Sequence, residues 1–182
     1  MSEASGIGRL RVPPRAKRGE VIEIRLLLQH GQVEHAKTAF APVAGKAPTV
    51  RKFEALQHWF NAIESGAVHA DAAGAQAGFD AKLAADKRDF DTRYALAQLH
   101  MSQQRWVPAM DELLEIVMRD KAWNGEAARK TYVAMLTLMA KPAPKAAAGE
   151  AKGALEVTGK AAAVSADPVL DAYRRKLSMA LF

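Results

Sequence analysis

Residues 93–121 read RYALAQLHMSQQRWVPAMDELLEIVMRDK, and this stretch predicts two antiparallel helices joined by a tight polar turn. Apolar side chains recur every three or four residues in each half, which is the period of an amphipathic helix. Leu96 and Ala97 form a large/small pair in the first helix, and Ala109 follows twelve residues after Ala97. Leu113 and Ile116 lie on the inner face of the second helix. A small side chain opposite a large one lets two helices cross closely.

This pattern resembles a tetratricopeptide repeat, a helical hairpin with a period of about 34 residues. Two positions depart from the repeat pattern: His100 replaces the usual tyrosine, and Lys121 replaces the usual terminal proline. The resemblance implies that Leu96, Ala97, Ala109, Leu113 and Ile116 pack the repeat.

The rest of the chain also shows mostly helical spacing. Val33, Ala36 and Phe40 share one helix face, and a broad apolar stripe runs from Phe53 to Ile63. Further helices are predicted at residues 75–86, 92–103, 107–120, 124–140 and 168–181. The Ala/Gly-rich stretch 70–78 is interpreted as a hinge, and the Ala/Gly/Lys-rich tract 141–166 as a flexible linker.

The N-terminal residues follow a different pattern. Arg9–Val12 alternates charged and apolar residues, Pro13 and Pro14 break the run, and Glu20–Arg25 resumes with β-branched residues. The pattern predicts two short strands. The expected fold is therefore mainly α, with tetratricopeptide-like hairpins and a short N-terminal β-strand pair. Its predicted parts are a basic segment (1–28), a helical domain (29–140), a linker (141–166) and a C-terminal capping helix (167–182).

A longer resemblance extends over roughly residues 29–182. The runs Arg93–Gln98, Asp111–Ile116, Arg119–Asn124, Ala128–Lys130 and Tyr173–Phe182 resemble the C-terminal repeat region of bacterial chaperedoxins, which are thioredoxin-like co-chaperones. The thioredoxin domain of that family is missing here, and the 141–166 tract replaces a short turn. The resemblance implies that the protein holds unfolded clients and passes them to the chaperonin or the Hsp70 system.

A second, shorter resemblance covers about 25 residues at the start. Gly8–Pro13, Lys17–Arg25 and Gln29–His30 are similar to the opening strands of the Z subunit of the SoxYZ sulfur-oxidation carrier, an immunoglobulin-like sandwich. The remaining strands of that sandwich are absent, so we interpret the match as a fused fragment.

Composition and charge narrow the function classes. The chain has 182 residues, a formal net charge of +6 and no cysteine, which excludes disulfides, thiolate metal sites and cysteine nucleophiles. Its start lacks a basic-then-apolar signal pattern, and its apolar stretches are shorter than the roughly 20 residues that span a bilayer. We expect no membrane association and a cytoplasmic location. The densest basic cluster is Arg9, Arg11, Arg15, Lys17 and Arg18, which is interpreted as a solvated arm, with a polyanion contact as the alternative.

No catalytic, cofactor-binding or metal-binding constellation is found in the sequence. His30, His35, His58, His69 and His100 lack metal-ligand spacing. No glycine-rich run has the spacing of a nucleotide loop. Trp106, Trp123 and Tyr132 are expected to pack between helices, while Trp59 or Trp123 could line a peptide groove. A non-enzymatic protein is therefore expected, without a cofactor.

The C-terminal helix carries the candidate interaction residues. Asp167 and Pro168 predict its start as an N-cap residue followed by proline. The candidate protein-binding set is Tyr173, Arg174, Arg175, Leu177, Leu181 and Phe182. This helix either caps the repeat or contacts a chaperone or a client protein. The alternative functions are a sulfur-oxidation accessory protein and a basic nucleic-acid-associated adaptor. The oligomeric state stays open.

Overall fold

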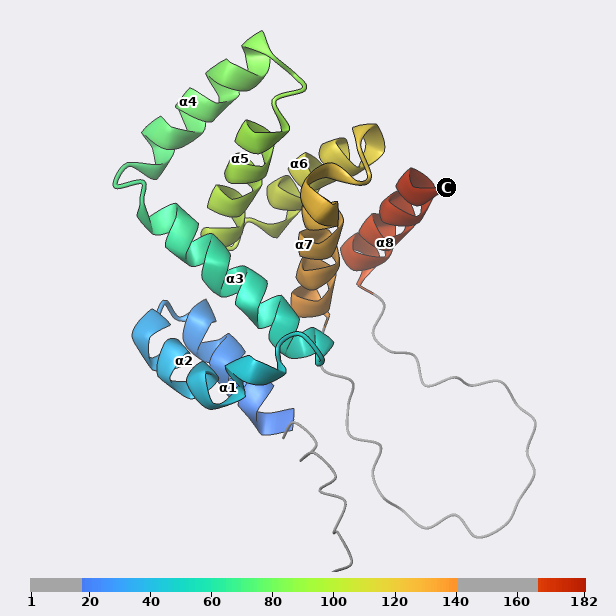
Figure 1. Cartoon of the computed structure of the whole chain (residues 1–182). Coiled ribbons are helices and arrows are strands. Elements are labelled where there is room, and N and C mark those ends of the chain that lie inside the picture. The colour runs from blue at the N-terminus through green and yellow to red at the C-terminus, as the bar shows by residue number, and fades with distance from the viewer. Residues whose placement is uncertain (1–17, 141–166) are drawn as a thin grey trace, which may run out of the picture. The chain divides into compact units, whose positions relative to one another are not determined.

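The computed structural model describes residues 18–140 and 167–182, and this part of the chain is almost entirely helical (Figure 1). Its elements are α1 (Arg18–Gln29), α2 (Val33–Phe40), the 3-10 helix η1 (Ala41–Lys46), α3 (Arg51–Ala67), α4 (Ala72–Ala85), α5 (Phe90–Ser102), α6 (Trp106–Arg119), α7 (Trp123–Met139) and α8 (Pro168–Leu181). The chain divides into two compact units between Val43 and Ala44. The 28/29 boundary expected from the sequence falls within the first unit, in the last turn of α1.

The first unit shows that the predicted β-strand pair is wrong where the structure describes it. Residues 20–25 lie within α1, and no strand occurs among residues 18–140 and 167–182. Ile24 and Leu28 are buried whereas Ile22 and Leu26 are exposed, so burial follows a four-residue period rather than alternation. Residues 9–12, expected to form the other strand, lie outside the described residues.

The end of α1 explains why a helix forms here. Gly31 has a φ of 72°, its N–H donates to the Leu28 carbonyl, and the Gln32 N–H donates to the Leu27 carbonyl. These two bonds form a Schellman motif, in which a left-handed glycine satisfies the last carbonyls of a helix. α2 packs against α1 as a hairpin, and its Ala36 and Phe40 are buried.

The second unit is built around α3, which packs against both α5 and α7. Neighbouring helices of the array also contact one another, with α4 on α5, α5 on α6, and α6 on α7. The apolar stripe of α3 supplies much of the core through Phe53, Leu56, Trp59 and Phe60, which are 4% exposed or less. Each such side chain stabilises the folded state by roughly 1.5–3 kcal/mol on burial. Trp59 is therefore part of the core, and its alternative assignment to a peptide groove is wrong.

The repeat-packing residues of α5 and α6 lie together in this core. Leu96, Ala97, Ala109, Leu113 and Ile116 are all 2% exposed or less. Asp89 caps the start of α5, and its carboxylate accepts hydrogen bonds from the Thr92 N–H and hydroxyl at 2.9 and 2.6 Å. A partly buried ion pair between Arg93 and Glu112 joins the two helices. The mainly helical fold with a tetratricopeptide-like hairpin is confirmed.

The expected hinge at 70–78 is wrong for residues 72–78, which belong to α4. The Asp71 carboxylate accepts a hydrogen bond from the Ala73 N–H at 3.0 Å and caps the helix. Alanine has the highest helix propensity, and it outweighs the two glycines of this segment. The predicted linker 141–166 lies outside the described residues.

Candidate protein-binding site

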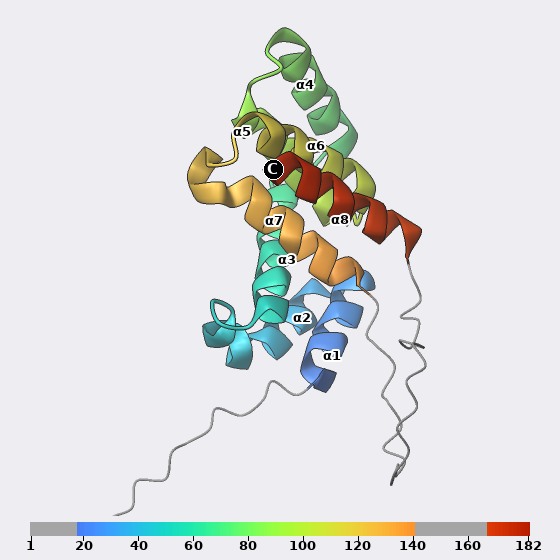
Figure 2. The same cartoon turned by 90° about the vertical axis from the view of Figure 1, so that its right-hand side faces the viewer.

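One face of α8 is packed on the helical array. Figure 2 shows α8 lying across α6 and α7, and its Leu170, Tyr173 and Leu177 are buried. Asp167 caps the helix by accepting hydrogen bonds from the Val169 and Leu170 N–H groups. This face therefore caps the end of the array, as terminal helices of repeat proteins do.

Two tyrosines fix the position of α8. The Tyr132 hydroxyl of α7 donates to the Tyr173 carbonyl at 2.8 Å, and the Tyr173 hydroxyl donates to Asp111 of α6 at 2.8 Å. Burial and the Asp111 carboxylate raise the pKa of Tyr173 to about 12. The phenol therefore stays protonated at neutral pH and keeps its donor role.

The charged residues of α8 lie on its exposed side. Arg174 pairs with Asp171 of the same helix at 3.0 Å, while Arg175 is exposed. The ammonium group of Lys176 lies 4.2 Å from the centre of the Tyr173 ring and 3.6 Å from Asp111. Of the predicted protein-binding set, Tyr173 and Leu177 therefore serve packing, whereas Arg174 and Arg175 are open to solvent.

An open groove lies between α6 and α8. Its volume is about 430 Å³, and it is lined by Leu114, Met118, Lys121, Lys176, Met179, Ala180 and Phe182. Three of its large apolar side chains are exposed, with Met118 at 51%, Met179 at 72% and Phe182 fully exposed. Lys121 donates a hydrogen bond to the Leu181 carbonyl at 2.7 Å, which holds the end of α8 beside the groove.

The protein-binding residues predicted from the sequence include only part of this groove. Phe182 belongs to the predicted set, and Leu181 is half-buried at the groove's edge. Met118 was missed because it lies on the outward face of α6 and becomes part of a groove only once α8 docks beside it. Met179 was missed because it lies off the apolar stripe of α8. Methionine is a common residue in surfaces that accept varied partners, which is the signal that could have identified both.

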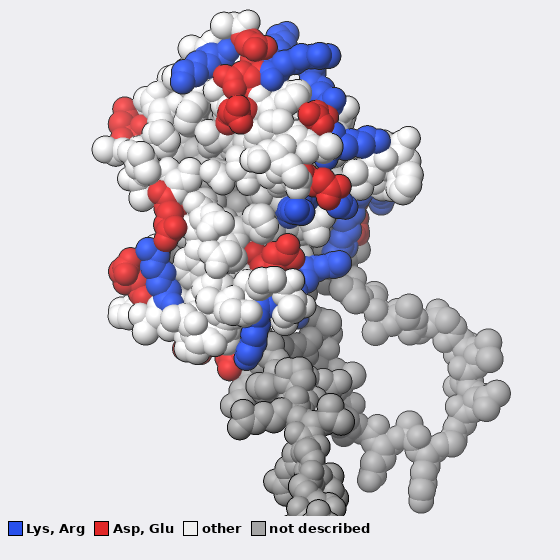
Figure 3. Space-filling view, in the orientation of Figure 1, with Lys and Arg blue, Asp and Glu red and all other residues white. Residues whose placement is uncertain are grey.

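On the face shown in Figure 3, acidic and basic side chains lie mixed around a central area that has no charged residues. The basic cluster at residues 9–18, which motivated a polyanion contact, falls outside the part whose side chains are described. Within the described residues, no group of His, Asp and Glu could hold a metal ion. None of the helices in this part has the length and apolar character to cross a membrane.

Comparison with known proteins supports the repeat assignment. A sequence model of the tetratricopeptide repeat family matches residues 69–152, which include α4 to α7. No match was found among curated proteins or among solved structures. The chain therefore contains a tetratricopeptide-like region, and repeats of this type generally mediate protein–protein interactions.

The second unit should lose stability as the pH falls below about 6.5, the ordinary pKa of histidine. In the folded chain, the pKa values of His58 and His100 are lowered, mainly because both imidazoles are buried. The unfolded chain therefore binds more protons than the folded chain in this pH range. Folding stability then rises with pH, by at most about 1.4 kcal/mol per pH unit for each histidine. Urea denaturation at several pH values measures the slope. It should flatten in a His58→Gln/His100→Gln variant, and an unchanged slope would contradict the assignment.

Proposed function

We propose that this protein is a non-enzymatic interaction module of the co-chaperone type, which binds partner proteins through the groove between α6 and α8. The observation that carries the proposal is the exposure of Met118, Met179 and Phe182 around one groove. Contiguous exposed apolar side chains rimmed by polar groups are typical of protein-binding surfaces. The neighbouring face of α8, with Leu170, Tyr173 and Leu177, is buried on α6 and α7, so the helix both completes the fold and presents the surface.

The charges beside the groove favour a partner segment with acidic residues. Lys121 and Lys176 line the groove, and the exposed Arg174 and Arg175 directly precede Lys176 on α8 without lining it. Among residues 18–140 and 167–182, Arg175 has no carboxylate partner. An apolar segment with an acidic edge would therefore satisfy both the apolar floor and the basic rim.

The resemblance to chaperedoxins supports a chaperone or an unfolded client as this partner. The tetratricopeptide-like region supports protein binding in general, and the chaperonin or Hsp70 role is our proposal. The sulfur-carrier alternative is less favoured, because residues 20–25 of the matching stretch lie in α1 rather than in a strand.

Charge reversal on α8 tests the proposal. The full chain is mixed with purified chaperonin, with purified Hsp70 and with a chemically unfolded client, and capture is measured for the wild type and for Arg174→Glu/Arg175→Glu. We expect the double variant to lose at least about tenfold in affinity for its partner, because four units of charge change on the exposed side of α8. Its melting temperature should match the wild type, since both side chains are exposed.

Lys87→Glu/Arg88→Glu is the matched control, because it reverses two adjacent exposed cations ahead of α5. This control should keep wild-type capture. Equal losses in both double variants would show a general charge effect, and unchanged capture in both would refute the α8 interface.

A further inference from the structure

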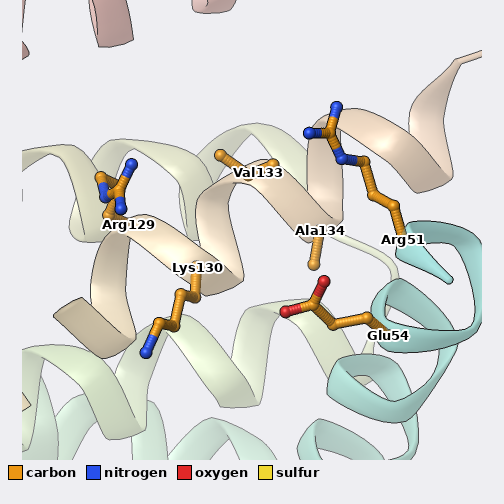
Figure 4. A pocket seen from close by; sticks show the side chains of 6 residues that line it. All are labelled: Arg51, Glu54, Arg129, Lys130, Val133 and Ala134. Carbon is orange, nitrogen blue, oxygen red and sulfur yellow. The ribbon is translucent and has the colours of Figure 1, made fainter. Parts of the chain in front are cut away.

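A second cavity lies on another side of the same unit, between the first turns of α3 and the middle of α7. Its volume is about 160 Å³, and Figure 4 shows the six residues that line it, namely Arg51, Glu54, Arg129, Lys130, Val133 and Ala134. The guanidinium groups of Arg51 and Arg129 point to the same side of α7 in this view, whereas the Glu54 carboxylate points toward Ala134. Three cations and one carboxylate thus surround a small, partly apolar space.

The cations of the cavity differ in how they are compensated. Within residues 18–140 and 167–182, Arg51 forms no ion pair with a carboxylate, whereas Lys130 donates to the Gly125 carbonyl at 2.8 Å and its charge acts on the Glu126 carboxylate. Arg129 has a donor to spare, because its Nε is buried without a hydrogen-bond partner in the described residues. A cavity with an excess of cations attracts anions.

The third cation is occupied by a carboxylate of the chain itself. Arg129 donates from Nη2 to Glu126 Oε2 at 2.6 Å, and this bond is the main cause that lowers the pKa of Glu126. Glu126 therefore remains ionised at neutral pH and occupies one side of the guanidinium group. About half of its side chain is exposed, so this bond is open to competition from a ligand.

Glu126 is held in an unfavourable backbone conformation. Asn124, Gly125 and Glu126 have φ values of 46°, 62° and 65°, so three successive residues are left-handed at the start of α7. A left-handed conformation is strained for a residue other than glycine, and such strain is concentrated at functional sites. Here the turn brings the Gly125 carbonyl to Lys130 and the Glu126 carboxylate to Arg129, and it thereby holds both cations beside the cavity.

We propose that this cavity binds a carboxylate side chain from an acidic peptide segment, and that Glu126 is an internal competitor which the bound carboxylate displaces from Arg129. A planar guanidinium group suits a carboxylate, which it can bind through two parallel hydrogen bonds. The cavity is smaller than the roughly 300 Å³ of typical small-molecule sites, so it accommodates one side chain rather than a nucleotide. Glu54 disfavours a doubly charged phosphate more than a singly charged carboxylate. This site is separate from the α6–α8 groove, and its occupation does not depend on the function proposed above.

The test is a fluorescence anisotropy titration of the full chain with a labelled hexaglutamate peptide. Arg51→Gln/Lys130→Gln should weaken binding by about tenfold, because two positive charges are removed from the cavity. Glu126→Gln should strengthen binding by about threefold, because the competitor loses its charge. Glu115→Gln is the matched control, since Glu115 forms an equivalent pair with Arg119 on α6, and it should leave binding unchanged.

Three results would overturn the proposal. They are the absence of saturable hexaglutamate binding, equal binding of a hexaglutamine peptide, and weakened binding in Glu126→Gln. Displacement of the peptide by an oligothymidylate, with the same dependence on Arg51 and Lys130, would also overturn it in favour of a phosphate site. Melting curves identify any variant that fails to fold, in which case Arg51→Gln alone replaces the double variant. Arg174→Glu/Arg175→Glu should retain hexaglutamate binding, which separates this site from the α8 interface.

Discussion

Replacing Trp59 with alanine should destabilise the second unit by about 3–5 kcal/mol, which is a large fraction of the stability of a typical domain. Trp59 is 1% exposed on α3, and its ring lies 5.0 Å from that of Trp106 in an edge-on arrangement. Removal of the Trp59 side chain leaves a cavity where α3 packs against α5 and α7. Urea denaturation followed by circular dichroism measures the loss.

Val68→Ala is the control for this experiment, because Val68 is 80% exposed just beyond α3 and should change stability by less than about 0.5 kcal/mol. A loss below about 1 kcal/mol for Trp59→Ala would show that α3 is not part of the cooperative core.

Replacing Leu177 with alanine should destabilise the packing of α8 by about 2–3 kcal/mol. Leu177 is 8% exposed, and it lies one turn after Tyr173 on the face that contacts α6 and α7. Hydrogen exchange measures the change. In the variant, the α8 amides should exchange faster than in the wild type, whereas the exchange of the α3 and α5 amides should change less.

Met179→Ala lies two residues further along the same helix and serves as the control. Met179 is 72% exposed, so its truncation should leave the exchange of α8 nearly unchanged. Equal effects of the two substitutions would mean that α8 is not docked as described.

Local patterns in the sequence predict the second unit well. The predicted helices 92–103, 107–120 and 168–181 agree within a residue or two with α5, α6 and α8. Their periods, the cap at Asp167 and the small residue at Ala109 are all encoded within one helix or one hairpin. Such signals do not depend on the rest of the fold.

The errors arose where two local signals compete. Residues 20–25 combine β-branched side chains with helical spacing, and Gly31, which ends α1, is the signal that should have decided between them. Residues 72–78 mix alanine with glycine, and the capping Asp71 determined the outcome.

The two candidate sites depend on tertiary structure. Met118 and Met179 meet only because α8 docks beside α6, and Arg51 and Arg129 meet only because α3 packs on α7. The left-handed turn at Asn124–Glu126 has one local signal, since asparagine and glycine both tolerate positive φ. The apolar spacing nevertheless predicts a regular helix from residue 124.

The central claim, that partner proteins bind in the groove between α6 and α8, is tested most directly by site-specific photo-crosslinking. A photoreactive phenylalanine analogue is placed at Met179 in the groove or at the equally exposed Val68, and each full-length protein is irradiated with purified chaperonin. We predict a crosslinked product from position 179 and none from position 68. Equal crosslinking from both positions, or crosslinking from position 68 alone, would contradict the claim.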